Sequence, residues 1–243
     1  MRTRRFFAPG SRMPDAIRLA AAALSLSLAA AGAARADPLP FNFALGGATD
    51  YVFRGVSQTR SHGQVFASVE ADLGPIGYAG VWASNVDFAD GATAEYDLVG
   101  GVRPKVGPVT VDLGFIRYGY AGQDHGPRDD YTELKVAPSM QLGPATFGAA
   151  WYHSEDFLRR SGPANYLEAN ASLPLGASPF SLSGAVGRQQ VKGPGDYTTW
   201  NLGIGYALGN HLGFDLRYWD TDDHDRRSSF GSRLVLGLKA TFP

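Results

Sequence analysis

The chain has 243 residues, 44% of them hydrophobic, with 22 basic side chains, 23 acidic side chains and no cysteine. It contains 31 glycines, 14 phenylalanines and 11 tyrosines. Glycine in a helix interior costs roughly 1 kcal/mol relative to alanine, so this composition argues against a helical protein. An all-β fold is favoured, and disulfides are excluded because there is no cysteine.

Residues 1–36 have the pattern of an export signal. Five arginines between Arg2 and Arg18 precede an Ala-rich apolar run at 19–34, which ends in Ala-Arg-Ala before Asp37. The run is shorter than the ~20 residues of a membrane-spanning helix, so we expect a cleaved signal peptide rather than an uncleaved anchor. Cleavage removes six basic residues and one acidic residue and leaves a charge of about −6, which argues against a nucleic-acid partner.

Two kinds of break alternate along residues 37–243. Tight turns containing Gly recur at 73–77, 106–110, 142–146, 175–180 and 208–212, most of them with Pro. Longer polar segments lie between them, such as VSQTRSHG, AGQDHGPRDD and TDDHDRRSS. Glycine supplies unusual dihedrals and proline cannot continue a β-ladder, so we expect short turns and long loops to alternate.

The segments between the breaks are twelve candidate strands, each near the roughly 9 to 11 residues that a tilted membrane strand requires. In the last of them, Leu234, Leu236 and Leu238 alternate with Arg233 and Lys239, which is the period of a strand with two unlike faces. The strands are expected at 42–54, 63–73, 76–88, 94–105, 109–121, 131–142, 145–154, 164–174, 180–190, 197–208, 211–220 and 230–242.

Twelve such strands with no helix to cover their apolar faces predict a closed antiparallel transmembrane β-barrel over residues 37–243, with short periplasmic turns and longer extracellular loops. Closure would satisfy every edge hydrogen bond within the membrane. A secreted soluble β-sandwich is the alternative, because alternation alone also permits it. In a barrel, nine aromatic side chains would point outward, mostly near strand ends: Tyr51, Phe53, Trp82, Phe88, Phe115, Trp151, Trp200, Tyr206 and Tyr218.

Several stretches resemble one known family. ATDYVFRGVSQTR (48–60), WASNVDF (82–88) and EYD (95–97) are similar to the TorF-type porins of Gram-negative bacteria, and YGYAG (118–122) resembles that family's Tyr-x-Tyr-Pro-Gly with Ala121 in place of the proline. The resemblance implies an outer-membrane β-barrel porin and supplies no substrate or catalytic residue. The residues that carry the motif are Asp50, Tyr51, Phe53, Arg54, Gly55, Ser57, Gln58, Thr59, Trp82, Asn85 and Asp87.

Alternation also predicts which charges line the pore: Asp50, Arg54, Glu70, Asp72, Asp87, Glu95, Asp97, Asp112, Arg217, Arg233 and Lys239. The acidic and the basic members would gather on opposing walls, which would set up a transverse field across a wet constriction. The same charges could instead pair into a plug, because an unpaired charge in a narrow lumen is costly. Adding Glu133, Glu168, Asp215, Arg103 and Lys135 gives ten acidic and six basic inward side chains, so an open lumen would mildly prefer cations.

The sequence gives weaker support to two other functions, hydrolysis and divalent-cation binding. His153 and Ser154 are adjacent in a strand and would point to opposite faces, so they do not form a nucleophile and its base. The acidic run at 220–225 could bind a divalent cation, although Arg226 and Arg227 beside it favour a solvated loop.

The sequence therefore predicts a passive outer-membrane channel for small polar solutes, with no enzyme activity, cofactor, metal or nucleic-acid partner. The expected partners are outer-membrane lipid and, during biogenesis, the barrel-assembly machinery. The alternatives are a sealed structural barrel and a barrel enzyme that acts on lipid or peptide.

Overall fold

The structure is a computed structural model that describes residues 40–192 and 195–243. The predicted signal peptide lies outside the described residues. Nowhere in residues 40–192 and 195–243 is there a helix long and apolar enough to cross a membrane.

Twelve long strands build the described part of the chain: β1 (Phe41–Ala48), β4 (Gln64–Asp72), β5 (Tyr78–Asn85), β6 (Ala94–Val102), β8 (Val109–Ala121), β9 (Tyr131–Leu142), β10 (Ala145–Ser154), β11 (Ala164–Pro174), β12 (Phe180–Val191), β13 (Tyr197–Leu208), β14 (Leu212–Thr221) and β15 (Arg233–Phe242). The shorter elements are β2 (Val52–Phe53), β3 (Val56–Ser57), β7 (Lys105–Val106) and the 3₁₀ helices η1 (Gly74–Ile76), η2 (Leu158–Arg160) and η3 (Ser228–Phe230).

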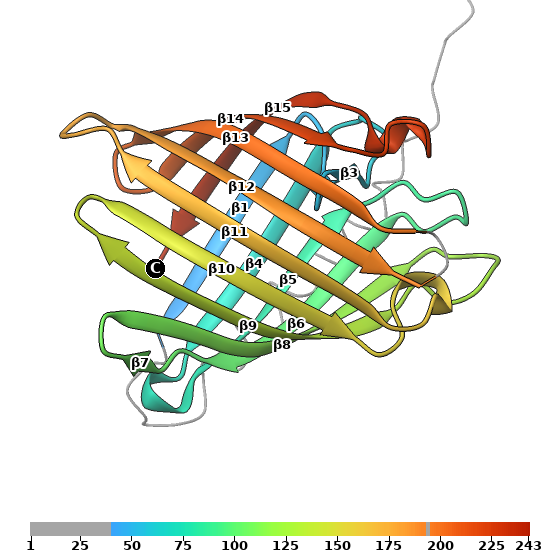
Figure 1. Ribbon diagram of the computed structural model, residues 1–243, viewed down its shortest axis with the longest axis horizontal. Coiled ribbons are helices and arrows are strands. Elements are labelled where there is room, and N and C mark those ends of the chain that lie inside the picture. The colour runs from blue at the N-terminus through green and yellow to red at the C-terminus, as the bar shows by residue number, and fades with distance from the viewer. Residues whose placement is uncertain (1–39, 193–194) are drawn as a thin grey trace, which may run out of the picture. The chain divides into compact units, whose positions relative to one another are not determined.

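The twelve strands form one closed antiparallel barrel (Figure 1). Each strand pairs with its neighbours in the chain, and β1 pairs with β15 from Phe43 opposite Phe242 to Ala48 opposite Gly237. A closed sheet has no unpaired edge, which is the condition for a strand structure to span a membrane. The predicted fold class is confirmed.

The connections at the two ends of the barrel differ in length. Short turns lie at one end, on the left in Figure 1, and longer connections lie at the other end. The connections at that second end are named here loop 1 (49–63), loop 2 (86–93), loop 3 (122–130), loop 4 (155–163), loop 5 (between β12 and β13) and loop 6 (222–232), and all but loop 5 are longer than the turns. In an outer-membrane barrel the short turns are periplasmic and the long loops extracellular.

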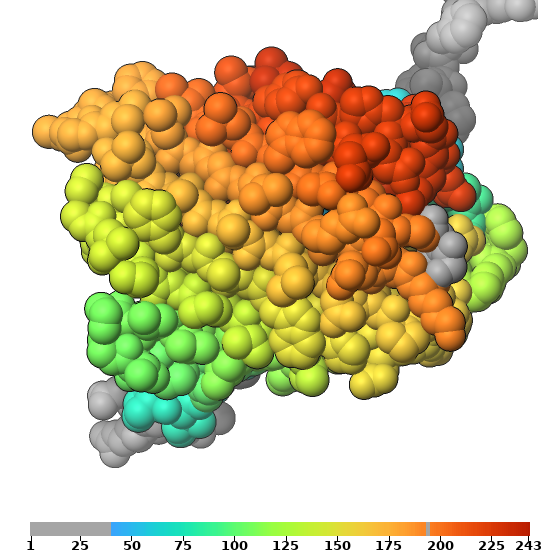
Figure 2. Space-filling model, in the orientation of Figure 1, coloured from blue at the N-terminus to red at the C-terminus, as the bar shows by residue number. Residues whose placement is uncertain are grey.

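The barrel is apolar outside and polar inside. Outward side chains such as Leu202 and Leu234 are 64% and 63% exposed, whereas the inward Glu133 and Gln189 are each 1% exposed. Large exposed hydrophobic side chains occur on eleven of the twelve barrel strands, and Figure 2 shows one face of this continuous wall. Monomeric soluble proteins rarely expose apolar patches beyond a few hundred Å². The outer wall therefore faces lipid, and the soluble sandwich alternative is wrong.

The predicted strand boundaries agree with the observed ones to within three residues for eleven of the twelve strands. The exception is the first strand, predicted at 42–54, which ends at Ala48. Beyond Ala48 the chain leaves the wall and turns into the lumen, where it forms the β2–β3 hairpin. Alternation continues through this hairpin, so the pattern does not mark where the wall ends.

The predicted aromatic girdle is wrong at four of its nine positions. The outward positions are Phe115, Trp151, Trp200, Tyr206 and Tyr218. Tyr51 and Phe53 lie in the hairpin and pack against buried aromatic residues, and Phe88 lies in loop 2 with its ring 5.3 Å from that of Tyr120. Trp82 faces inward, because it stands opposite Ser68 and Asp97 in the sheet. Aromatic side chains here fill the extracellular half of the lumen as well as the lipid interface.

Candidate functional site: the lumenal hairpin

Within the sequence motif at 48–60, residues 52–57 fold as a tight hairpin inside the barrel, named here the lumenal hairpin. Val52 pairs with Ser57 and Phe53 with Val56, so Arg54 and Gly55 form a two-residue turn. Both turn residues have positive φ, 49° for Arg54 and 83° for Gly55, as a type I′ turn requires. An arginine in this region of backbone space is strained by on the order of 1 kcal/mol, so its side chain must gain enough contacts to offset that cost.

Arg54 makes those contacts at the centre of the lumen. Its Nη1 and Nη2 atoms donate to Glu133 Oε1 and Oε2 at 2.8 and 2.7 Å, and Nη1 also donates to Gln189 Oε1 at 2.9 Å. The guanidinium lies over the rings of Tyr152 and Tyr166, 4.8 and 4.3 Å from their centroids. These partners belong to β9, β10, β11 and β12, so one side chain contacts four consecutive strands of the barrel wall, two through hydrogen bonds and two through aromatic rings.

The rest of the hairpin touches the remaining wall. A Cβ atom at Gly55 would lie 2.2 Å from Thr199 Oγ1 and 2.8 Å from Thr221 Cγ2, so the turn is pressed against β13 and β14. On the other side, the rings of Phe53 and Tyr118 are 5.9 Å apart. The hairpin thus reaches across the lumen and occludes it at this level.

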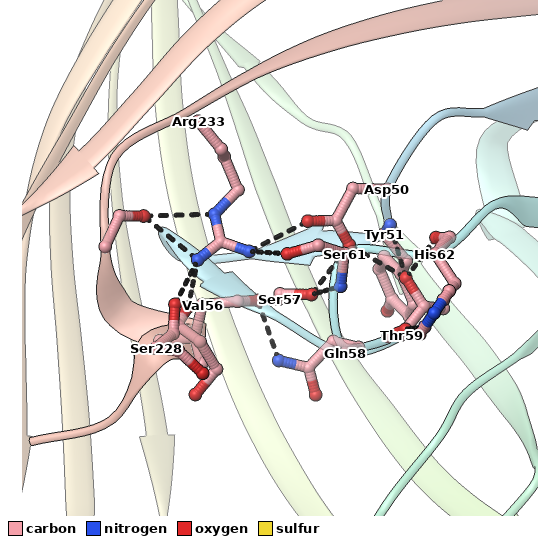
Figure 3. Close-up of polar contacts among 12 residues, drawn as sticks. Asp50, Tyr51, Val56, Ser57, Gln58, Thr59, Ser61, His62, Ser228 and Arg233 are labelled. Carbon is pink, nitrogen blue, oxygen red and sulfur yellow. Dashed lines mark hydrogen bonds and ion pairs between the residues drawn. The ribbon is translucent and has the colours of Figure 1, made fainter.

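Asp50 holds the base of the hairpin (Figure 3). Its Oδ1 accepts hydrogen bonds from Ser57 Oγ at 2.7 Å and Thr59 Oγ1 at 2.8 Å, and its Oδ2 accepts one from Arg233 Nη1 at 2.8 Å. Arg233 also donates to the backbone carbonyls of Ser228 and Ser229 in loop 6. The two members of this ion pair are nearly buried, so loop 1 is tied to β15 and loop 6.

Two more carboxylates lie beside the hairpin on β6. Glu95 is 2% exposed and accepts a hydrogen bond from Tyr51 Oη at 3.3 Å, and Asp97 is 8% exposed. Asp97 Oδ1 has no hydrogen-bond partner among the described residues. The hairpin and its surroundings therefore hold buried acidic groups that no basic side chain neutralises in the part of the chain described.

The periplasmic half of the lumen has a second, more solvated network. Arg103 donates to both carboxylate oxygens of Glu70 at 3.0 and 3.2 Å and lies 3.7 Å above the ring of Tyr78. Asp112 accepts from Tyr78 Oη and Lys135 Nζ, each at 2.7 Å. The Arg103 side chain is 45% exposed, so water reaches this level of the barrel.

The remaining predicted pore residues divide between lumen and rim. Arg217 faces inward and bonds Asp215, Asn201 and Ser183, and Lys239 stands on the inward face of β15 opposite Gly46. Asp72 ends β4 at the short-turn rim, where it accepts from the backbone N–H of Gly74.

Asp87 is not in the lumen, contrary to the prediction. It lies in loop 2 beyond the end of β5, is exposed, and pairs with the exposed Arg60 at 3.4 Å. Two residues of the family motif support loop 1. Gln58 Nε2 donates to the carbonyl of Val56, and Asn85 Nδ2 donates to the carbonyl of Gly63 at the end of the loop.

The two charged walls predicted from alternation are mostly joined into local pairs. Arg54 crosses the lumen to Glu133, Arg103 pairs with Glu70, and Arg217 pairs with Asp215 two residues away. At the hairpin Arg54 and Arg233 are paired with Glu133 and Asp50, whereas Glu95 and Asp97 have no basic partner among the described residues. Gln189, Tyr152 and Tyr166 complete the surroundings of Arg54 and were not singled out from sequence, although strand parity places all three on the inward face.

The described residues form neither a His153–Ser154 nucleophile-and-base pair nor a cation site at 220–225. His153 stacks on the outward Trp151 at 5.6 Å, whereas Ser154 is buried on the inward side, so they are on opposite faces as expected. In the acidic run, Asp222 lies 3.5 Å from Arg188, Asp223 pairs with Arg226, and Asp220 is bonded to His224. Over residues 40–192 and 195–243, there is no cluster of three or more His, Cys, Asp or Glu side chains that could hold a metal ion.

Residues 31–241 match the family described as "Bacterial protein of unknown function (Gcw_chp)". The chain belongs to this family. No curated protein matches the sequence. The Gcw_chp barrel is similar in fold to a structure of the KdgM porin in complex with disordered oligogalacturonate, with a TM-score of 0.60 and 7% identity over 84% of this chain and 99% of that chain. It is also similar to the NanC porin, with a TM-score of 0.58 and 10% identity over 84% of this chain and all of that chain.

These likenesses show the fold of this Gcw_chp protein. A closed barrel of this kind, with lipid-facing apolar strands and a polar lumen, is the architecture that spans the bacterial outer membrane. The protein therefore has the fold of an outer-membrane β-barrel, similar to that of these porins.

Proposed function

We propose that this protein is a passive outer-membrane channel for small polar solutes, in which the lumenal hairpin is a movable constriction. The observation that carries the proposal is the way the hairpin is held. It is a short insert with two residues in each strand, and among the described residues its backbone makes no hydrogen bond to the backbone of the barrel strands. Below it the lumen is polar and partly exposed to water, and a cavity of about 420 Å³ at the short-turn end is lined by Asp72, Tyr78 and Arg103.

A sealed structural barrel is the second candidate, and the occlusion by the hairpin favours it. The sealed barrel and the gated channel differ in what happens when the hairpin leaves the lumen. A sealed barrel gains nothing from an insert that can move, whereas a gated channel conducts once the insert is displaced. The porin fold of the similar structures supports the channel.

Mild cation preference is the selectivity that the lumen supports. With Asp87 excluded, nine acidic side chains (Asp50, Glu70, Asp72, Glu95, Asp97, Asp112, Glu133, Glu168 and Asp215) and six basic ones (Arg54, Arg103, Lys135, Arg217, Arg233 and Lys239) lie in the lumen or at its rim.

Planar-bilayer recording of refolded protein tests the proposal. We compare the mature chain with a variant in which residues 51–58 are replaced by a flexible Gly-Ser linker, after showing that both are heat-modifiable on gels. Stepwise currents that are rare in the mature chain and frequent in the variant support a gated channel. A well-folded variant without currents would show that the barrel is sealed.

A further inference from the structure

Three extracellular loops meet at a buried pair of carboxylates. Asp90 in loop 2 and Asp129 in loop 3 are both 0% exposed, and the guanidinium of Arg159 in loop 4 lies 3.1 Å from the first carboxyl group and 3.8 Å from the second. The backbone N–H of Asp124 in loop 3 also donates to the carbonyl of Asp90 at 3.0 Å. We name Asp90, Asp129 and Arg159 the loop clasp.

The clasp has two carboxyl groups, those of Asp90 and Asp129, but only one positively charged side chain, that of Arg159. Arg159 Nη2 lies 3.1 Å from Asp90 Oδ2, whereas its Nε is 3.8 Å from Asp129 Oδ1. Asp90 also accepts from the backbone N–H of Ala92 at 3.3 Å and from Gln123 Nε2 at 3.4 Å. Neither side-chain oxygen of Asp129 has a hydrogen-bond partner among the described residues if both carboxyls are ionised. A proton held between the two carboxyls removes this discrepancy, since Asp129 then donates to Asp90.

The clasp sits beside the residues on which the lumenal hairpin packs. Val86 and Ala92 of loop 2 form a buried cluster with Tyr118, Tyr120 and Tyr131 of the wall. Tyr51 and Phe53 of loop 1 and Phe157 and Leu158 of loop 4 pack against the same cluster. Arg159 follows Leu158 directly and has a positive φ of 61°, so the clasp holds loop 4 in a strained turn over the cluster.

We propose that a proton shared by Asp90 and Asp129 locks loops 2, 3 and 4 together over the hairpin, and that loss of this proton loosens the loops and frees the hairpin to leave the lumen. This inference rests on the proposed function for its effect on conductance, but the change in the loops stands alone. The protein is then closed in acid and more open at neutral pH.

The titration of the pair agrees with this geometry. Burial, followed by the hydrogen bond and negative charge of Asp90, raises the pKa of Asp129 to about 7. Burial also acts to raise the pKa of Asp90, but the hydrogen bond from Asp129, the Ala92 N–H and Arg159 more than offset it and lower that pKa. A carboxyl whose pKa is higher in the closed state than in the open state stabilises the closed state below its open-state pKa. That stabilisation is lost as pH rises from about 4 to about 7 and is absent above that range.

Other charged groups around the clasp come from the same loops. Asp130 adds negative charge beside Asp129 and is itself 3.4 Å from Arg117. Asp124 lies against Gly91, and His125 contacts Asp124. Histidine side chains ordinarily titrate in the same pH range, so His125 needs its own control.

Hydrogen exchange of the refolded full barrel between pH 5 and pH 8 tests the proposal directly. Asp129→Asn keeps a donor toward Asp90 without the titration, and comparing it with the natural protein at each pH cancels the intrinsic pH dependence of exchange. We expect exchange in loops 2, 3 and 4 of the natural protein to rise by at least tenfold relative to Asp129→Asn over this range. Asp90→Asn is the second variant should Asp129→Asn fail to fold. His125→Gln and the exposed Asp225→Asn are controls that should retain the natural response.

Equal exchange of the natural protein and Asp129→Asn at every pH would overturn the clasp, and so would loss of the response in His125→Gln. Bilayer recordings of the same samples answer the separate question of function. If the loops loosen with pH but neither the natural chain nor the hairpin-replaced variant conducts, the clasp holds and the channel proposal fails.

Discussion

Arg54 at the tip of the lumenal hairpin and Glu133 on β9 form a bidentate ion pair across the lumen, 79 residues apart in the chain and both nearly inaccessible to water. The pair joins the first extracellular loop to the far wall of the barrel. Removing one partner of a buried pair leaves an uncompensated charge, which makes this contact the most sensitive point of the constriction.

Arg54→Met is expected to destabilise the docked hairpin by about 3 to 5 kcal/mol, because Glu133 is then left buried and unpaired. The hairpin should leave the lumen, and single-channel currents should become more frequent. Arg60→Met is the matched control, since Arg60 lies in the same loop and its pair with Asp87 is half exposed. Natural channel behaviour in Arg54→Met would mean that the ion pair does not hold the constriction.

Gly55→Ala should also loosen the hairpin. The added methyl group would meet Thr199 Oγ1 at 2.2 Å, in addition to the strain of an alanine at a φ of 83°. Gly209→Ala is the control, because Gly209 has a similarly positive φ of 63° but open space around its Cβ position. Hydrogen exchange of residues 51–58 should rise in Gly55→Ala alone. If hydrogen exchange rose similarly in both variants, contact of Gly55 with the wall would not be the cause.

Leu236→Arg tests the register of the outer wall. Leu236 points outward near the middle of β15, and a charge at the bilayer midplane costs about 2 to 4 kcal/mol in transmembrane barrels. Leu208→Arg, at the turn end of β13, should cost no more than about 1 kcal/mol. Guanidinium unfolding in lipid vesicles measures both, and equal costs would contradict the assigned depth of these side chains.

We expect the selectivity of the proposed channel to depend on the charged network in the periplasmic half of the lumen. Glu70→Gln with Asp112→Asn removes the acidic partners of Arg103 and Lys135, so the reversal potential in a salt gradient should shift toward anions. The shift should shrink as salt rises, because charges farther apart than about 10 Å are screened at 0.1 M. Asp87→Asn removes a loop charge outside the lumen and should leave the potential unchanged. Equal potentials in all three proteins would place the conducting path away from this network.

The wall of the barrel was predictable from sequence because it follows from local rules. Gly and Pro mark the turns, and a strict period of two assigns each side chain to lipid or lumen, so Leu236 and Lys239 were both placed on their correct faces. Glu70, Asp97 and Arg217 were assigned to the inward face in the same way.

The constriction was not predictable in this way. Residues 49–57 continue the alternation of β1, and their inward turn depends on contacts with Glu133, Gln189 and Thr199, which are far away in the chain. The Arg-Gly pair at 54 and 55 was the only local sign of a tight turn. Trp82 was misplaced for a related reason, because an inward tryptophan is useful only when the aromatic Tyr51 is there to pack against it.

The position of the hairpin also orders the assembly of the barrel. The hairpin directly follows β1, the first strand of the barrel. Arg54 nevertheless binds Glu133 and Gln189, 79 and 135 positions later, and Asp50 binds Arg233, 183 positions later. Contacts over such separations form slowly, because the chain between them must first be ordered. The seam between β1 and β15 completes the cylinder around an insert attached to β1 itself. The insert is therefore enclosed when the seam closes, and in a chain that closes with loop 1 outside, the lumen stays empty and Glu133 unpaired until the hairpin enters.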